Sequence, residues 1–324
     1  MNSSVVRADP GSTLVLSRNA TADGLSAPLR SRIAQGQLKL VRRGVYTDAA
    51  AFAQLDDTAS YRTRVLATLA LRPDAVVTSY SAAVFLGLPM IGKWPKEVYL
   101  LSGTSSGRRR NGVVELGRRG GESIVETDGR LMTSIPYTLL HICRTARFVS
   151  ALAIVDAAVH IDRFDRTPAL ITIAELAAYA AEQLPFPGSI RAARVLRNAT
   201  TLADNSFETL SRVAIDELGF PQPILQHKLY LPLSNRYVFT DFAWLEHALA
   251  GEADGLGKYL GGGPGPVKDP AQTVIEEKQR EDEIRGLGLA VARWGWKDAL
   301  RRTPLKAILL QKGLPLVRRP RTYV

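Results

Sequence analysis

The sequence contains a single cysteine, Cys143, among 324 residues. One thiol cannot form an internal disulfide and cannot supply a cysteine-based metal site. The chain also lacks an apolar run near the ~20 residues that a membrane-spanning helix needs. Its first residues, 1–12, do not place an apolar core behind a basic segment as a secretion signal does. These absences favour a cytoplasmic protein without a membrane partner.

Acidic residues are missing from residues 301–321, and the whole chain carries a net charge of +11 with a pI near 9.9. The basic residues gather in short clusters at Arg42 and Arg43, at residues 108–110 and at Arg118 and Arg119. Clustered cations bind phosphate backbones favourably, because their binding releases counterions from the nucleic acid. DNA is therefore the expected partner. The alternative is a solvated surface with a disordered basic tail.

Residues 13–47 have the pattern of a small DNA-binding domain. Ser26 is placed to cap a helix, and Gly36 is placed to end it. Residues 37–46 then predict two short strands around a basic tip. A helix, a turn, a helix and a basic hairpin form a winged helix-turn-helix outline; a small α+β subdomain that binds no groove is the alternative. The expected DNA contacts, including the later arginine cluster, are Arg30, Arg32, Lys39, Arg42, Arg43, Arg108, Arg109 and Arg110.

Three stretches resemble one known family. GQLKLVRRGVY (residues 36–46), VVTSYSAAVFLGLP (76–89) and IPYTLLHICR (135–144) are similar to the winged-helix and middle regions of AbiEi-type antitoxins. The resemblance implies binding to operator DNA in a type IV toxin–antitoxin or abortive-infection system. It also implies a cognate nucleotidyltransferase-like toxin as a partner at the genetic level. An aspartate is common in that family where this chain has His141.

The middle of the chain, residues 49–203, offers no recognisable chemistry. Its pattern predicts a strand at residues 98–101 and helices at 151–159 and 172–183. His141 and His160 are isolated in the sequence, so structural roles are expected for both. We interpret this segment as a scaffold on which the arginines at 108–110 can contact phosphates.

The stretch 240–259 concentrates carboxylates in what reads as one β-hairpin. Side chains alternate along a strand, so Glu252 and Asp254 point the same way. If the turn is centred near residues 246–247, Asp241 lies across from Glu252 with the two Cβ atoms about 5 Å apart. Like charges that close need a cation or a proton held by a raised pKa. Oxygen ligands of this kind suit Mg²⁺.

The elements around this hairpin predict the order α-β-β-β-α-β. The expected elements are a helix from residue 205 to Gly219, strands at 224–231, 237–244 and 248–254, a charged helix at 274–287 and a last strand at 289–294. This order resembles the PD-(D/E)XK nuclease fold, and its nearest variant is the very-short-patch-repair (Vsr-like) endonuclease group. The stretches EADG with KY (252–255 and 258–259), EKQRE (277–281) and VARW (291–294) resemble the pattern of that group.

The nuclease resemblance implies a catalytic set made of Glu208, Asp241, Glu252, Asp254 and Lys258. Asp241 and Glu252 would hold Mg²⁺ or Mn²⁺, Glu208 would add a carboxylate, and Lys258 would orient or deprotonate a water. Asp254 departs from the usual motif, because a lysine normally stands two residues after the second acid. Lys258 is then the expected substitute, with Lys278 as an alternative. Gln226 lies on the strand where related nucleases often place a polar residue near the metal.

Each of these residues also has a purely structural interpretation. Glu208 fits a capping box with Asn205 and an ion pair with Arg212 four residues later. Asp254 could belong only to a turn before Gly255. Trp294 and Trp296 are expected to pack in the core and at its rim rather than to stack on bases.

The sequence therefore predicts a mixed α/β (α+β) protein in four parts. These are a winged helix (1–48), an AbiEi-like middle domain (49–203), a nuclease-like domain (204–302) and a basic tail (303–324). The predicted function is that of a DNA-binding protein of the AbiEi antitoxin type with a Mg²⁺-dependent nuclease domain. The alternative is a transcriptional autorepressor whose nuclease-like domain is catalytically silent.

Overall fold

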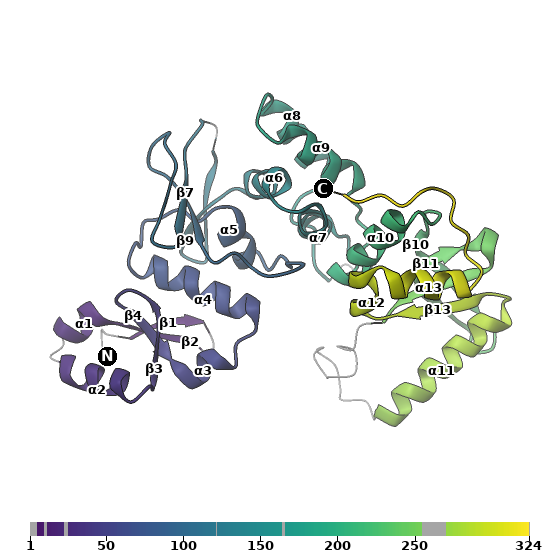
Figure 1. Ribbon diagram of the computed structural model, residues 1–324, viewed down its shortest axis with the longest axis horizontal. Coiled ribbons are helices and arrows are strands. Elements are labelled where there is room, and N and C mark those ends of the chain that lie inside the picture. Colours follow the sequence, from purple (N-terminus) through teal and green to yellow (C-terminus); the bar gives the residue numbers. More distant parts are fainter. Residues whose placement is uncertain are drawn as a thin grey trace. The chain divides into compact units, whose positions relative to one another are not determined.

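The computed structural model describes residues 5–9, 12–22, 25–120, 122–163, 166–254 and 270–323. Helices and several small sheets alternate along the chain, which confirms the mixed α/β class (Figure 1). The chain divides into two compact units: unit 1 is Met1–Ala146 with Ala174–Ala192, and unit 2 is Arg147–Ile173 with Ala193–Val324. The segment 49–203 is therefore shared between the two units. Among the described helices, none is both long and apolar enough to cross a membrane.

A four-stranded sheet with the order β1-β2-β4-β3 opens unit 1. Its elements are β1 (Val5–Asp9), β2 (Ser12–Leu16), α1 (Ser17–Ala22), α2 (Ser26–Ala34), β3 (Leu38–Arg42) and β4 (Val45–Asp48). Strands β3 and β4 are antiparallel around Arg43 and Gly44, and β2 pairs with β4 on its other side. Two helices followed by a basic hairpin match the outline that the sequence predicts for a winged helix-turn-helix.

The two ends of α2 differ in how well the sequence predicts them. Gly36 adopts a φ of +70°, a left-handed conformation that glycine takes at little cost, and α2 ends just before it as expected. The N-cap prediction is wrong by one residue, because the helix begins at Ser26 and Leu25 occupies the cap position. The Ser26 hydroxyl lies inside the first turn and donates to the Thr21 hydroxyl, at 3.3 Å.

The core of this sheet is completed by α4 (Asp57–Leu69), which follows the short helix α3 (Ala49–Ala53). Leu66 and Ala67 of α4 pack against Leu14 and Val45 of the sheet in one buried cluster. The apolar residues of α4 thereby fix the hairpin β3–β4 to the rest of unit 1.

The remainder of unit 1 contains small sheets and the helices that cover them. The elements are α5 (Ser79–Phe85), β5 (Val98–Leu101), β6 (Arg108–Arg110), β7 (Val113–Leu116), β8 (Ile124–Thr127), β9 (Arg130–Thr133), α6 (Ile135–Thr145) and most of α8 (Ile173–Glu182). The predicted strand at 98–101 is confirmed by β5. Val77 bridges the two small sheets through backbone contacts with Leu100 and Met132.

Unit 2 is built on a sheet with the order β10-β11-β12-β13. Its elements are α7 (Phe148–Val159), α9 (Ser189–Asn198, shared with unit 1), α10 (Ser206–Leu218), β10 (Ile224–Leu231), β11 (Arg236–Trp244), η1 (Leu245–His247), β12 (Leu249–Ala253), α11 (Pro270–Gly286), β13 (Ala290–Trp294), α12 (Trp296–Arg301) and α13 (Thr303–Gln311). From α10 to β13 the order is α-β-β-β-α-β, which confirms the prediction. Strand β13 runs parallel to β12, and the other pairs are antiparallel.

Different helices pack on the two faces of this sheet, and α11 lies apart from α12 and α13 (Figure 1). Ala250 of β12 faces α11 and packs in a buried cluster with Ile284. The next residue, Gly251, faces the other way. A Cβ added there would lie 2.7 Å from the Trp294 ring, so the position requires glycine. Trp294 is buried as predicted, and its indole nitrogen donates to the Ser211 hydroxyl at 2.9 Å.

The C-terminal basic segment is folded against unit 2. Arg318 and Arg321 both form ion pairs with Asp216 of α10, and the Tyr323 ring stacks on Phe148 with centroids 4.2 Å apart. These contacts exclude the disordered basic tail that the composition also allowed.

Candidate active site

Glu208 lies in the first turn of α10, where its carboxylate is buried. The side chain of Asn205 caps the helix by accepting hydrogen bonds from the N–H groups of Phe207 and Glu208. In return, Glu208 accepts from the Asn205 amide (2.7 Å) and from the Asp204 N–H (2.9 Å). This is close to the expected capping box, although the backbone donor is one residue earlier than usual.

The ion pair between Glu208 and Arg212, which the structural interpretation of Glu208 offered, is not formed. Arg212 donates to the buried carboxylate of Asp156 on α7 (2.8 Å) and to the carbonyl of Asn198 (2.7 Å). Because Arg212 pairs with Asp156 of α7, it does not pair with Glu208. The Glu208 carboxylate instead contacts Gln226 of the sheet.

Gln226 connects Glu208 to the strands. Its amide donates to Glu208 Oε2 at 2.8 Å, and its carbonyl accepts from Arg163 at 2.6 Å. Gln226 has a φ of +49°, a left-handed conformation that is costly for a residue with a side chain. The register of β10 with β11 places it opposite Asp241. Such strain persists where the surroundings fix it, and it is concentrated at functional sites.

Asp241 and Glu252 lie across from one another, as the hairpin pattern predicts. The turn falls at η1, and the paired residues Phe242 and Gly251 are each one position away from them. The ladder ends at that pair, and Asp241 Oδ2 accepts the hydrogen bond of the Ala253 N–H at 2.9 Å. The carboxylate of Asp241 therefore stands where the two strands separate.

Glu252 is buried and is held by an arginine that the sequence pattern does not single out. Both terminal nitrogens of the Arg280 guanidinium donate to Glu252, at 2.8 and 3.0 Å, and Arg280 also donates to the carbonyl of Phe239. Burial lowers the pKa of Arg280, but the bonds and charge of Glu252 outweigh it and hold this pKa above its ordinary value. The two-fold contact is the strong form of an arginine–carboxylate pair.

Arg293 of β13 joins the same network. It forms ion pairs with Glu277 and Glu281 of α11 and with Asp254, and its guanidinium is 3.9 Å from Glu252. Burial lowers the pKa of Arg293, yet Glu277, Glu252 and Glu281 raise it above its ordinary value. Among the described residues, Arg280 and Arg293 thus connect the carboxylates at the end of β12 to those of α11.

The pKa of Glu208 is raised to about 8, first by burial and then by the negative charge of Asp241. Three donors point at its oxygens and oppose this shift, but they do not overcome it. At neutral pH the Glu208 carboxyl therefore holds its proton beside the charge of Asp241. A cation can take the place of that proton.

The structure thus places Glu208, Asp241, Glu252 and Asp254 in one region of unit 2, with Gln226 beside them. Lys258 lies outside the described residues. Among those residues, no three His, Cys, Asp or Glu side chains are arranged to hold a metal ion. Glu252 is turned to Arg280, which separates it from the other two acids of the predicted metal set.

The predicted DNA-binding residues lie in unit 1. Arg30, Arg32, Lys39 and Arg43 are exposed on α2 and on the β3–β4 hairpin. Arg42 differs, because its guanidinium is half-buried and donates to the Thr68 hydroxyl of α4 at 3.2 Å. Burial and the nearby charge of Arg72 lower the pKa of Arg42.

The second arginine cluster is the exposed strand β6. Arg108 pairs with Glu115 at 2.6 Å, and Arg109 lies 3.5 Å from Glu97. These acids reduce the positive charge that residues 108–110 offer to a phosphate.

Comparison with known proteins gives distant matches to two curated relatives. Over 174 residues the chain is 27% identical to an uncharacterized protein of Mycobacterium tuberculosis strain CDC 1551 / Oshkosh and, equally, to one of strain ATCC 25618 / H37Rv. The match covers 54% of this chain and spans 58% of the length of each relative. No family model and no solved structure matches the chain. The resemblances to AbiEi-type antitoxins and Vsr-like nucleases therefore stay predictions.

Proposed function

We propose that the protein is a DNA-binding phosphodiesterase whose metal centre is the pair Glu208 and Asp241 in unit 2. One observation carries this proposal: strained Gln226, which lies opposite Asp241 in the strand register, donates to Glu208, and the charge of Asp241 raises the pKa of that acid. Two neighbouring carboxyl groups, one of them with a raised pKa, form a site that suits a cation.

The donor set fits a hard divalent cation. Mg²⁺ takes oxygen ligands, usually one or two carboxylates with several waters, and Mn²⁺ has similar preferences. Asp241 and Glu208 would hold it, and Glu252 could join if it left Arg280. Bound there, the metal would activate a water and stabilise charge on the scissile phosphate.

The surrounding cations have separate roles in this proposal. Arg163 holds the Gln226 carbonyl and its guanidinium lies 4.6 Å from the centre of the Phe239 ring, which fixes the Gln226 amide on Glu208. Arg280 and Arg293 bring positive charge to Glu252 and Asp254, at the position where the usual motif has its lysine. Glu208 would release its proton when a metal bound there.

The test of this function is metal-dependent cleavage of DNA. Purified full-length protein is incubated with supercoiled plasmid and Mg²⁺, Mn²⁺ or EDTA between pH 6 and 9. We expect nicking only with metal, with a rate that rises with pH and levels above the Glu208 pKa of about 8, because the metal binds the deprotonated carboxylate. Absence of nicking on duplex, single-stranded and mismatched DNA would contradict the proposal.

A catalytically silent module is the second candidate, and one observation favours it. Arg280 occupies both oxygens of Glu252, an acid that the nuclease pattern assigns to the metal. In this case the protein would be an autorepressor and antitoxin of the AbiEi type, with a nucleotidyltransferase-like toxin encoded nearby. Operator binding without any cleavage would favour this candidate.

Both candidates require DNA binding by unit 1, and the hairpin arginines test it. Arg43 is exposed at the tip whereas Arg42 is tied to Thr68, so only Arg43 is placed to contact a phosphate. We expect Arg43→Ala to weaken DNA binding and to reduce the slope of log K against log salt by about 0.9. Arg42→Ala should leave that slope unchanged. Fluorescence anisotropy over a salt series measures both, and equal slopes for wild type and Arg43→Ala would contradict the winged-helix interface.

A further inference from the structure

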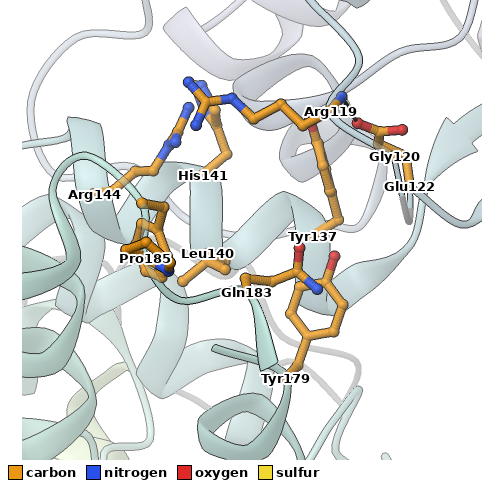
Figure 2. A pocket seen from close by; sticks show the side chains of 11 residues that line it. Arg119, Gly120, Glu122, Tyr137, Leu140, His141, Arg144, Tyr179, Gln183 and Pro185 are labelled. Atoms are coloured by element: carbon orange, nitrogen blue, oxygen red, sulfur yellow. Dashed lines mark hydrogen bonds between the residues drawn. The ribbon is translucent and has the colours of Figure 1, made fainter. Parts of the chain in front are cut away.

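A cavity of about 240 Å³ lies within unit 1 (Figure 2). It is lined by residues of the loop before β8, of α6 and of the end of α8. Those that the argument uses are Arg119, Tyr137, His141, Arg144, Tyr179 and Gln183.

Helix α6 supplies one wall through residues at helical spacing. One face of the helix carries four lining residues, which are separated by three, one and three positions: Tyr137, Leu140, His141 and Arg144. This face carries a phenol, an imidazole and a guanidinium, which is unlike the apolar stripe of a helix that only packs.

Two positive charges meet at one end of the cavity. In Figure 2 the side chains of Arg119 and Arg144 converge beside His141. Burial and then the charge of Arg119 lower the pKa of Arg144. Neither guanidinium forms an ion pair with a carboxylate of the described residues. Glu122, the acid of this cavity, accepts instead from the backbone N–H of Arg119.

His141 adds a neutral donor to the charged end. Its pKa falls to about 3, because it is buried and because Arg144 and Arg119 repel a further positive charge. Its Nδ1 lies 2.9 Å from the hydroxyl of Ser79, a buried residue held at a φ of +52°. When Ser79 donates to Nδ1, the ring proton is on Nε2, which can then donate to a ligand.

The opposite end of the cavity is aromatic. Tyr179 and the Gln183 amide lie there, with Tyr137 along the wall between them and Arg119 (Figure 2). Aromatic rings stack on planar bases, and an amide can hydrogen-bond a base edge.

We propose that this cavity binds a mononucleotide, with its phosphate on Arg119 and Arg144 and its base against Tyr179. Paired guanidiniums recognise phosphate oxygens, and a neutral histidine beside them donates without adding repulsion. The volume is just below the range of about 300–1,000 Å³ for sites of drug-sized ligands, which suits one nucleotide rather than a dinucleotide. The nucleotide could be free or the 5′ end of a strand, since both offer the same phosphate monoester.

The test is calorimetric titration of the full-length protein with four probes: AMP, adenosine, inorganic phosphate and ribose 5-phosphate. We expect AMP to bind at least about tenfold more tightly than each of the other three, because only AMP fills both ends. Competition by a 5′-phosphorylated oligonucleotide, compared with its 5′-hydroxyl form, distinguishes a strand end from a free nucleotide. Equal binding of AMP and adenosine would overturn the phosphate site, and equal binding of AMP and ribose 5-phosphate would overturn the base site.

Variants connect the binding to this cavity. Arg144→Gln and Arg119→Gln should each weaken AMP binding about tenfold or more, and Tyr179→Ala should weaken AMP but not inorganic phosphate. Arg191→Gln is the matched control, because Arg191 is an exposed arginine of α9 that does not line the cavity. Melting curves confirm folding, and Arg144→Lys, which keeps the charge, provides a second variant. AMP affinity that is the same in wild type, Arg144→Gln and Arg119→Gln would overturn the proposal.

Discussion

Replacing Arg280 with methionine should lower the free energy of unfolding by about 3–5 kcal/mol, because it leaves a buried carboxylate without its partner. The two side chains are only 18% and 8% exposed, so water cannot take over the role of the guanidinium. Arg293 remains 3.9 Å from Glu252, too far for a hydrogen bond. Urea denaturation measures the loss as a lower midpoint with an unchanged slope.

Two further variants isolate the buried pair. Arg285→Met removes an arginine from the same helix whose side chain is 53% exposed, and it should cost no more than about 1 kcal/mol. Arg280→Met combined with Glu252→Met should recover most of the stability, since an apolar pair no longer carries an uncompensated charge. Equal losses for Arg280→Met and Arg285→Met would show that Glu252 does not depend on the pair.

The stability of the Arg280→Met variant can also be measured with and without Mg²⁺, which tests whether Glu252 binds the metal. If Glu252 joins the metal set once Arg280 is gone, Mg²⁺ stabilises this variant more than the wild type, because it binds only the folded state. The absence of such an effect would exclude Glu252 from the metal set while leaving Glu208 and Asp241 in it.

Asp241→Asn should reduce plasmid nicking by more than about 100-fold, since even partners outside the metal's own ligands are worth 10–100-fold. The asparagine oxygen can still accept from the Ala253 N–H, so the strands keep their geometry. Binding of DNA by unit 1 should not change. Asp282→Asn, the same substitution at an exposed residue of α11, is the control.

Outcomes of the nicking assay separate the two proposed functions. Loss of nicking with retained DNA binding favours the phosphodiesterase. Nicking that survives in Asp241→Asn would come from another centre or another protein, and it would contradict the assignment of this residue.

The strand pattern allowed much of unit 2 to be predicted. Alternation of apolar and polar residues, with a turn near residues 246–247, was enough to place Asp241 across from Glu252. Gly219 follows the last residue of α10 with a φ of +89°, as its position after the apolar stripe indicates. These features are local, so neighbouring residues determine them.

Contacts between distant elements could not be predicted in the same way. The spacing of Glu277, Arg280 and Glu281 shows that they share a face of α11, but it does not show that this face meets Glu252. Arg212 illustrates the same limit, because a buried carboxylate 56 positions away outcompetes the acid four residues before it. Arg42 is a similar case, because its guanidinium donates to the hydroxyl of Thr68 on α4, which is distant in the sequence.

The sequence pattern also could not predict the cavity of unit 1. Along the chain His141 has no neighbouring histidine or acid, and Arg144 lies one turn further on α6. Its other neighbours, Arg119 and Ser79, come from a loop and from another helix. Only the fold brings these groups together.

The most direct test of the metal centre is the number of protons released when Mg²⁺ binds. Calorimetric titrations at pH 7 in buffers of different ionisation enthalpy measure this number. A carboxyl with a pKa of about 8 is mostly protonated at that pH, so we expect release of about 0.9 proton per metal in the wild type. Asp241→Asn should bind Mg²⁺ at least about tenfold more weakly and release fewer protons. Binding without proton release, or equal titrations for the two proteins, would contradict the assignment of Glu208 and Asp241 as the centre.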